Sequence, residues 1–103
     1  MNAESFIEHW LGVKVRQLKV IYYKFVSPGN SGVPDRILVL PTGEVWFVEL
    51  KDDKGILSPI QMAQQHRLIK SRAKVFTLYG MTGAMHFLEK ELKPHLKEAG
   101  YEV

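Results

Sequence analysis

Three charged residues in an otherwise apolar stretch are of types that could act on a phosphodiester bond. Asp35 begins one short apolar segment, and Glu49 and Lys51 end the next. Side chains alternate along a strand, so Glu49 and Lys51 share one face, about 6.6 Å apart along the backbone. If the two segments pair as a hairpin around residues 41–43, Asp35 lies near the Glu49–Lys51 end. The two carboxylates and the ammonium group would then suit metal-assisted phosphodiester chemistry.

The same residues have an alternative interpretation, an Asp–Lys or Glu–Lys ion pair at a sheet edge. A Glu-x-Lys pair alone is weak, because it arises by chance in about one chain of this length in three. The context favours a metal site. Pro34 and Asp35 precede Glu49 across an expected strand–turn–strand, and the charges end a strand that is otherwise apolar. Buried carboxylates repel one another and become neutral unless a cation holds them.

The elements around these residues are expected in the order α-β-β-β-α-β-α. Apolar residues at i, i+3 and i+4 spacing predict the first helix, and runs of β-branched and aromatic residues predict the strands. The predicted helices cover 3–18, 59–72 and 83–93, and the predicted strands cover 20–26, 35–40, 44–51 and 74–79. The helix before the last strand implies a parallel crossover. The fold class is therefore α/β, a mixed sheet flanked by helices.

Capping signals set the expected helix ends. Ser58 with Pro59 and Gln61 forms a capping box with proline at the first helical position. Thr82 is expected to cap the last helix, and Pro94 is expected either to interrupt it or to begin a new cap before a final turn over 95–99. Within the second helix, Ile60, Ala63 and Leu68 are expected on the buried side. These assignments position the charged cluster between a hairpin and a crossover helix.

Composition limits the class of protein. The 103 residues are expected to form one domain over 1–103, and 46% are hydrophobic, as in ordinary globular proteins. There is no cysteine, so disulfides and thiolate zinc sites are excluded. No apolar run has the length of a membrane span, and the N-terminus lacks the pattern of a secretory signal, so a cytoplasmic location is expected. The net charge of +3 permits a polyanionic partner without requiring one.

Several polar residues have two interpretations that the pattern leaves open. The loop over 27–32 either connects two strands or lets backbone N–H groups approach a phosphate. Lys24 and Arg36 either contact a DNA backbone or are solvated strand ends. Glu4 and Glu8 lie four residues apart on one helix face. They either form a solvated acidic edge or contribute an acid to the site.

Together these motifs resemble the PD-(D/E)xK nuclease superfamily. Within it, the chain resembles the VRR-NUC (virus-type replication-repair nuclease) domain, in the small stand-alone form typical of bacteriophages. The resemblance covers nearly the whole chain and lies in KFVSPG, GVPDR, FVELK and LSPIQ. One departure is visible, because similar members often carry histidine where this chain has Gln65. His66 follows it and is expected to be a surface residue.

The resemblance implies a restriction-endonuclease-like fold and a role for each matching residue. Asp35, Glu49 and the backbone carbonyl of Leu50 would bind Mg²⁺ or Mn²⁺. Lys51 would orient the attacking water or stabilise developing charge. Glu8 would be the acid of the first helix and contact the metal through water, with Glu4 as the rival for this role. Gln61 would support the site, and the phosphate approach would be lined by Ser27, Gly29 and Asn30.

The resemblance also implies an activity and partners. Members similar to this chain are metal-dependent DNA endonucleases that leave 5′-phosphate ends and act as homodimers on branched DNA such as Holliday junctions. No small-molecule cofactor and no membrane are expected, and a phage protein would act in the host cytoplasm. One alternative is a non-catalytic DNA-binding component of a replication or packaging assembly. Another is a sequence-specific restriction-type nuclease, for which 103 residues leave little room for base-reading elements.

Overall fold

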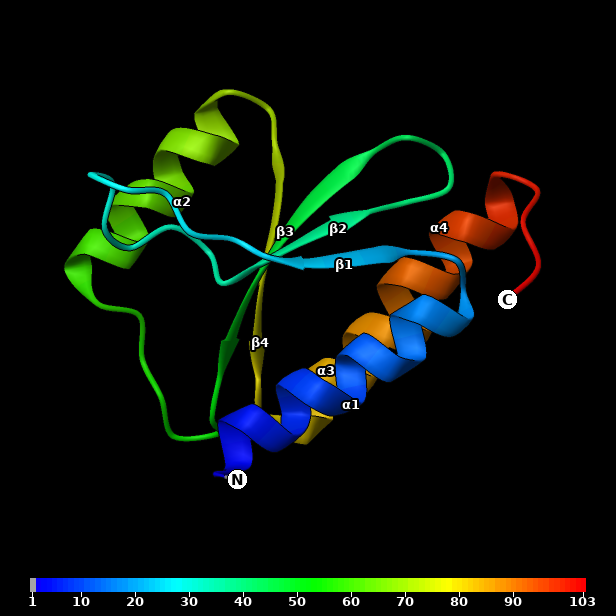
Figure 1. The fold of residues 1–103 in the computed structure, drawn as a ribbon, viewed down its shortest axis with the longest axis horizontal. Coiled ribbons are helices and arrows are strands. Elements are labelled where there is room, and N and C mark those ends of the chain that lie inside the picture. Colours follow the sequence, from blue (N-terminus) through cyan, green and yellow to red (C-terminus); the bar gives the residue numbers. More distant parts are fainter. Residues whose placement is uncertain (1) are drawn as a thin grey trace.

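The computed structural model of this chain describes residues 2–103 and shows a four-stranded sheet flanked by helices (Figure 1). The elements are α1 (Ala3–Gln17), β1 (Ile21–Lys24), β2 (Arg36–Val39), β3 (Val45–Lys51), α2 (Pro59–Lys70), β4 (Lys74–Tyr79), α3 (Gly80–His86), the π-helical η1 (Phe87–Leu92) and α4 (Lys93–Glu98). None of the helices within residues 2–103 is long and apolar enough to cross a membrane.

The sheet combines an antiparallel meander with one parallel pair. Its strand order is β1-β2-β3-β4, and the first two pairings are antiparallel. β4 pairs with β3 in parallel after the crossover through α2. The predicted α/β class, the mixed sheet and the parallel crossover are therefore confirmed.

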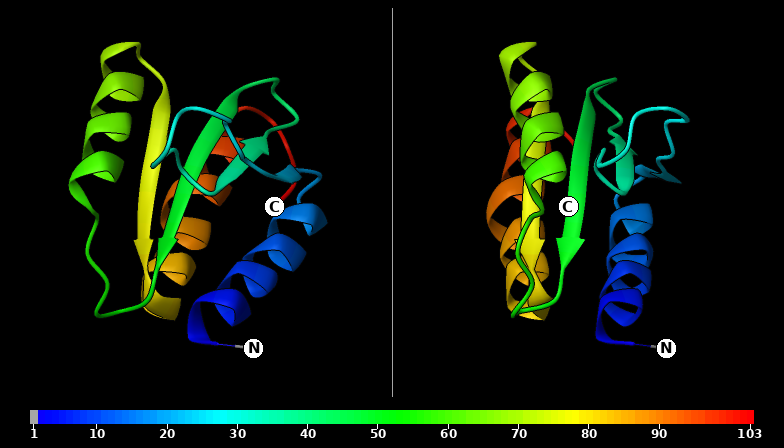
Figure 2. Two further views of the ribbon diagram at one scale, coloured as in Figure 1. Left: turned by 60° about the vertical axis from the view of Figure 1, so that its left-hand side comes forward. Right: turned by 90° about the vertical axis from the view of Figure 1, so that its left-hand side faces the viewer.

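The two faces of the sheet have different chemistry. α1 and the C-terminal helices cover one face, and α2 covers the other (Figures 1 and 2). The first face holds the core, in which Leu38, Trp46 and Val48 of the sheet pack with Leu11 of α1 and Phe87 of η1. The face toward α2 carries the residues that alternate with these along the strands.

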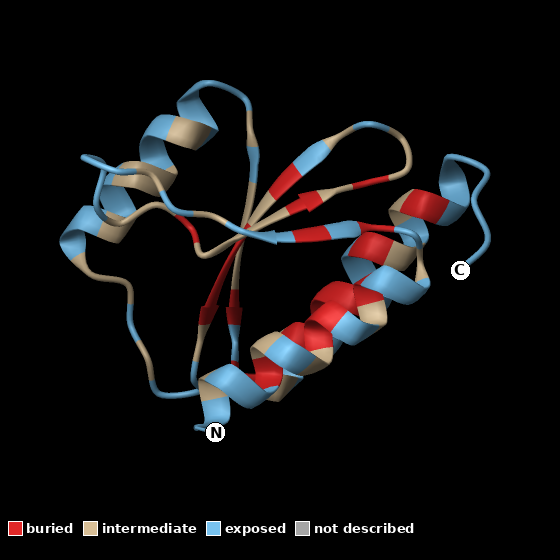
Figure 3. Cartoon of the chain, in the orientation of Figure 1, coloured by how far each residue is buried: buried red, intermediate tan, exposed pale blue. Residues whose placement is uncertain are grey.

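α2 contains no buried residue, as Figure 3 shows by the absence of red on this helix. The prediction that Ile60 and Ala63 face inward is wrong, because both are exposed, whereas Leu68 is half-buried. The physical reason is the surface beneath the helix. The side chains of Gln61 and Gln65 face polar groups of the sheet there, so the contact is polar.

The C-terminal helix differs from its predicted form at Thr82, whereas Pro94 lies in the first turn of α4, as the re-capping alternative expects. It begins at Gly80 directly after β4, so Thr82 is not its cap, and it continues through Pro94 to Glu98. A proline ring clashes with the carbonyl four residues earlier, here that of Lys90. Lys90 lies in η1, where hydrogen bonds run to the fifth residue instead of the fourth. This wider turn accommodates the proline without ending the helix.

Candidate active site

Asp35 and Glu49 face one another across two neighbouring strands. Arg36 pairs with Val48, so the same antiparallel register extended by one residue places Asp35 opposite Glu49. Lys51 lies on the same strand face as Glu49, and its Nζ is 3.9 Å from Glu49 Oε2. The structure therefore brings together the three residues whose spacing suggested chemistry.

Glu49 is in an unfavourable environment for a charged group. Its exposed fraction is 2%, and no group within residues 2–103 forms a hydrogen bond to its Oε1. Burial, followed by the negative charge of Asp35, raises the pKa of Glu49 to about 8, while Lys51 opposes the rise. A buried carboxylate oxygen without a partner beside a second carboxylate is the setting that a bound cation stabilises.

The donor set fits a hard divalent cation. Mg²⁺ is commonly held by one or two carboxylates together with water and substrate phosphates. Asp35 and Glu49 supply two such carboxylates. No cluster of three or more His, Cys, Asp or Glu suited to a metal occurs in the described chain. Carboxylate oxygens are the donors that hard divalent cations prefer.

Gln61 connects the start of α2 to Glu49. The predicted capping box is present: Ser58 Oγ accepts the Gln61 N–H at 3.2 Å, and Gln61 Oε1 accepts the Ser58 N–H at 2.9 Å. Since its oxygen is used in the cap, the Gln61 amide presents Nε2 to Glu49 Oε2, at 3.4 Å. The cap therefore sets the orientation of a side chain that contacts the site.

Gln65, which departs from the family pattern, helps to hold α2 beside the site. Its Nε2 donates to Thr77 Oγ1 at 2.8 Å, and Thr77 Oγ1 donates to Gln65 Oε1 at 3.2 Å. Thr77 is the strand partner of Glu49. This pair fastens α2 to β4 beside the site. His66, expected at the surface, is exposed.

The two acids of α1 have different surroundings. Glu8 Oε1 accepts a hydrogen bond from Arg36 Nε at 2.6 Å and also pairs with Arg36 Nη2. The pKa of Glu4 is raised, first by burial and then by the charge of Asp35, while Lys51 lowers it. The Glu4 carboxyl group therefore interacts electrostatically with the charged groups of the site. The Glu8 carboxylate is instead paired with the Arg36 guanidinium.

Arg36 and Lys24 are strand partners, and they belong to a cluster beneath α1. The Arg36 guanidinium lies 4.7 Å from the centre of the Tyr22 ring. Both cations line a pocket of about 280 Å³ together with Glu8. Since Arg36 and Asp35 are consecutive in the strand, their side chains point to opposite faces of the sheet.

The loop between β1 and β2 rests on α2. Gly29, at φ +81°, helps close a turn in which the Asn30 N–H donates to the Ser27 carbonyl at 2.9 Å. A Cβ added at Gly32 would lie 2.9 Å from the backbone of Ile60, so this approach requires glycine. The predicted phosphate-approach residues Ser27, Gly29 and Asn30 are thereby held next to the crossover helix.

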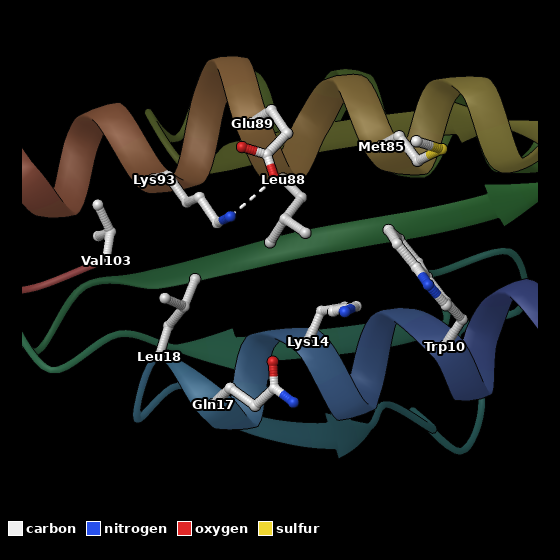
Figure 4. A pocket seen from close by; sticks show the side chains of 9 residues that line it. All are labelled: Trp10, Lys14, Gln17, Leu18, Met85, Leu88, Glu89, Lys93 and Val103. Atoms are coloured by element: carbon white, nitrogen blue, oxygen red, sulfur yellow. Dashed lines mark hydrogen bonds and ion pairs between the residues drawn. The ribbon is translucent and has the colours of Figure 1, made fainter.

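A separate pocket of about 360 Å³ lies between α1 and the C-terminal helices (Figure 4). Trp10 and Leu88 line it, and the Lys93–Glu89 ion pair lies beside Leu88. Asp35, Glu49 and Lys51 do not line it. The chemistry of the carboxylate site is therefore not located in this pocket.

A mixed sheet carrying facing carboxylates and a lysine at adjoining strand ends has the groups that metal-assisted phosphodiester cleavage requires. A solved structure of a VRR_NUC domain matches the chain with a TM-score of 0.83 and 27% identity, covering 88% of this chain and 99% of that one. "Putative nuclease p44" of Acyrthosiphon pisum secondary endosymbiont phage 1 is 43% identical over 75 residues, which are 73% of this chain and 81% of that protein. No family profile matches. The chain belongs to the VRR-NUC family, as its motifs predicted.

Proposed function

We propose that this protein is a metal-dependent endonuclease that hydrolyses phosphodiester bonds in DNA. The observation that carries the proposal is the buried Oε1 of Glu49, which has no partner in the described chain and lies beside Asp35. Such a pair costs free energy in the absence of a cation. The family membership and the phage nuclease relative support the same conclusion.

Asp35 and Glu49 are the proposed ligands of Mg²⁺ or Mn²⁺, with the backbone carbonyl of Leu50 as a third oxygen. When bound, such a cation supplies positive charge against phosphate oxygens and lowers the pKa of a water molecule. The protein's own contribution is to hold the two carboxylates together in an environment of low polarity. Gln61, fixed by its cap, holds Glu49 Oε2.

Lys51 is the proposed catalytic cation. Its ammonium group is half-buried and lies 3.9 Å from Glu49 Oε2, on the strand face that carries the carboxylates. From there it would orient the attacking water or stabilise the negative charge that develops on the phosphate. In the role of helix acid we favour Glu4 over Glu8, because Arg36 occupies the Glu8 carboxylate.

The proposed substrate is branched DNA, cut by a homodimer. A two-fold axis gives two active sites that can cut two strands symmetrically. Exposed apolar residues on α2, Met62 at 52% and Ile69 at 55%, support contact with a second copy. The phage origin of the relative supports action in the host cytoplasm.

The test is cleavage of a labelled four-way junction beside linear duplex and single strands, in Mg²⁺, Mn²⁺ and EDTA. We expect metal-dependent cuts that favour the junction. Metal-dependent cutting without junction preference would remove the branched-DNA assignment and leave the nuclease assignment. Binding without cleavage in either metal would contradict the catalytic proposal and favour a non-catalytic DNA-binding module.

A further inference from the structure

The charges of this protein are unevenly distributed along the chain. Residues 54–88 contain five Lys or Arg and no Asp or Glu, whereas the rest of the chain contains nine basic and eleven acidic residues. Four of the five cations lie between Arg67 and Lys74, at the C-terminal end of α2 and just beyond it. α2 therefore connects Gln61, which contacts Glu49, to a cationic end.

A polar pocket lies where this end of α2 meets the loop between β1 and β2. Its volume is about 300 Å³, and no acidic residue lines it. Ser27 and Asn30 of the loop face Gln64, Arg67 and Ser71 of the helix end across it. Within residues 2–103, Arg67 forms no ion pair, so its charge is not neutralised by a neighbouring carboxylate.

The walls of this pocket supply hydrogen-bond donors. Asn30 Nδ2 donates to Ser27 Oγ at 3.0 Å, which leaves the Ser27 hydroxyl proton free to donate. A guanidinium such as that of Arg67 can donate two parallel hydrogen bonds to a phosphate. Gln64 Nε2 donates to the Ser31 carbonyl at 3.1 Å and holds the loop on the helix. Donors and one cation, without a carboxylate, suit a phosphate group.

The helix end itself does not oppose an anion strongly. A helix C-terminus carries about half a negative charge. Arg67 and Lys70 in the last turn carry full positive charges and therefore outweigh it. Arg72 and Lys74, just beyond the helix, add to the positive potential.

We propose that this pocket binds a backbone phosphate of the DNA strand that is cleaved at the carboxylate site. Arg67 is the residue that makes the main contact with this phosphate. The inference rests on the proposed nuclease function and identifies where the substrate strand continues. Arg67 follows Gln61 by six residues, about 9 Å along the helix axis. The pocket therefore lies beyond the carboxylate site along α2, and the phosphate it binds flanks the scissile one.

The test combines Arg67→Ala with DNA in which one backbone phosphate at a time is replaced by a neutral methylphosphonate. Binding is measured in EDTA, where no cleavage is expected. For the wild type, we expect one position flanking the scissile phosphate at which the replacement weakens binding about tenfold, the size of a lost charge-assisted contact. Arg67→Ala should weaken binding to unmodified DNA by a similar factor and be insensitive to replacement at that position.

Two further readouts complete this test. Arg67→Ala should lower the slope of log affinity against log salt by about one, as expected for one lost phosphate contact. In Mg²⁺ it should raise KM and leave kcat at saturating DNA unchanged. The matched control is Lys97→Ala, which removes an exposed cation of α4 and should change none of these values. Asn30→Ala should reproduce a weaker form of the Arg67→Ala result.

The outcomes separate this inference from the proposed function. Equal losses for wild type and Arg67→Ala at every methylphosphonate position would overturn the phosphate subsite while leaving the nuclease assignment intact. The same holds if Arg67→Ala binds DNA as the wild type does. A wild-type protein that neither binds nor cuts DNA would overturn both proposals.

Discussion

At the scale of single residues, the main feature of the site is the electrostatic repulsion between two carboxylates. Asp35 faces Glu49 across the strands, and its charge adds to burial in raising the pKa of Glu49 to about 8. The sequence predicted this proximity, because the strand–turn–strand pattern determines which residues lie opposite one another. It did not predict which acid of α1 senses the site. Glu4 and Glu8 share one helix face, and only the packed position of Arg36 distinguishes them.

The first prediction concerns stability without metal. A pKa raised from 4.5 to about 8 in the folded state stabilises the protein below about pH 4.5, and this contribution is lost as the pH rises through about 8. In EDTA, the free energy of unfolding should therefore fall over this range. Asp35→Asn removes the facing charge, so it should reduce the fall and stabilise the protein by about 1 kcal/mol at pH 8. Denaturant unfolding at several pH values measures this, with Glu98→Gln as an exposed control.

The same variant, Asp35→Asn, also tests the role of this carboxylate in cleavage. Asp35→Asn should abolish cleavage while it stabilises the fold, because the charge that destabilises the metal-free protein is the proposed metal ligand. An Asp35→Asn protein that is less stable than the wild type in EDTA would contradict this account of the Glu49 environment.

The second prediction distinguishes the two helix acids. Glu4→Gln should lower the cleavage rate at saturating DNA by about tenfold, in the range found for single catalytic groups, with little loss of stability. Glu8→Gln should chiefly destabilise the protein, because it removes the charged partner of Arg36. Single-turnover cleavage and thermal unfolding of both variants measure the difference. The reverse pattern would return the role of helix acid to Glu8.

At the scale of elements, α2 decides how the site is supported. The capping box was predicted because its signature is local, confined to Ser58, Pro59 and Gln61. The polar face of α2 was not predicted, because it depends on which sheet residues lie beneath the helix. The same holds for the C-terminal helix. Pro94 is a strong local breaker, yet the buried side chains of Leu92 and Leu96 and the preceding π-helical turn keep the helix continuous.

The third prediction follows from the two roles of Gln61, which takes part in the cap of α2 and contacts Glu49. Ser58→Ala removes the cap and should cost about 1 kcal/mol of stability. It should also lower the cleavage rate, since the cap fixes the side chain that contacts Glu49. Asn2→Ala is the matched control, because Asn2 caps α1 through the Ser5 N–H and should cost a similar amount without changing the rate. Equal rates for the two variants below their unfolding temperatures would contradict the link between cap and site.

At the scale of the whole molecule, the hydrophobic core and the candidate site lie on opposite faces of the sheet. One sheet face is covered by α1 and the C-terminal helices and contains the buried core, while the other carries the charged residues beneath α2. The fold class and the mixed sheet could be predicted from the sequence, because periodicity and the crossover helix largely determine them. The distribution of exposed apolar side chains on α2 could not be predicted from the sequence, because it depends on which face of the helix packs against the sheet.

The fourth prediction concerns assembly. If the exposed stripe of α2 forms the contact between two copies, sedimentation should detect a homodimer for the wild type. Met62→Glu should shift it toward the monomer, because a charge would be buried at the contact. The control is Lys90→Glu on the exposed side of η1, which changes the net charge by −2, compared with −1 for Met62→Glu, and should leave the dimer intact. A monomer at all concentrations for the wild type would contradict the homodimer.

The central claim is that Asp35, Glu49 and Lys51 form a metal-dependent phosphodiester-cleaving centre. The most direct measurement is cleavage of labelled DNA by the wild type and by Lys51→Ala, in Mg²⁺, in Mn²⁺ and in EDTA, with DNA binding measured for both proteins. We predict cuts by the wild type in either metal, none in EDTA, and a loss of at least about a hundredfold for Lys51→Ala with its DNA binding retained. Cleavage in EDTA, or undiminished cleavage by Lys51→Ala, would contradict the claim.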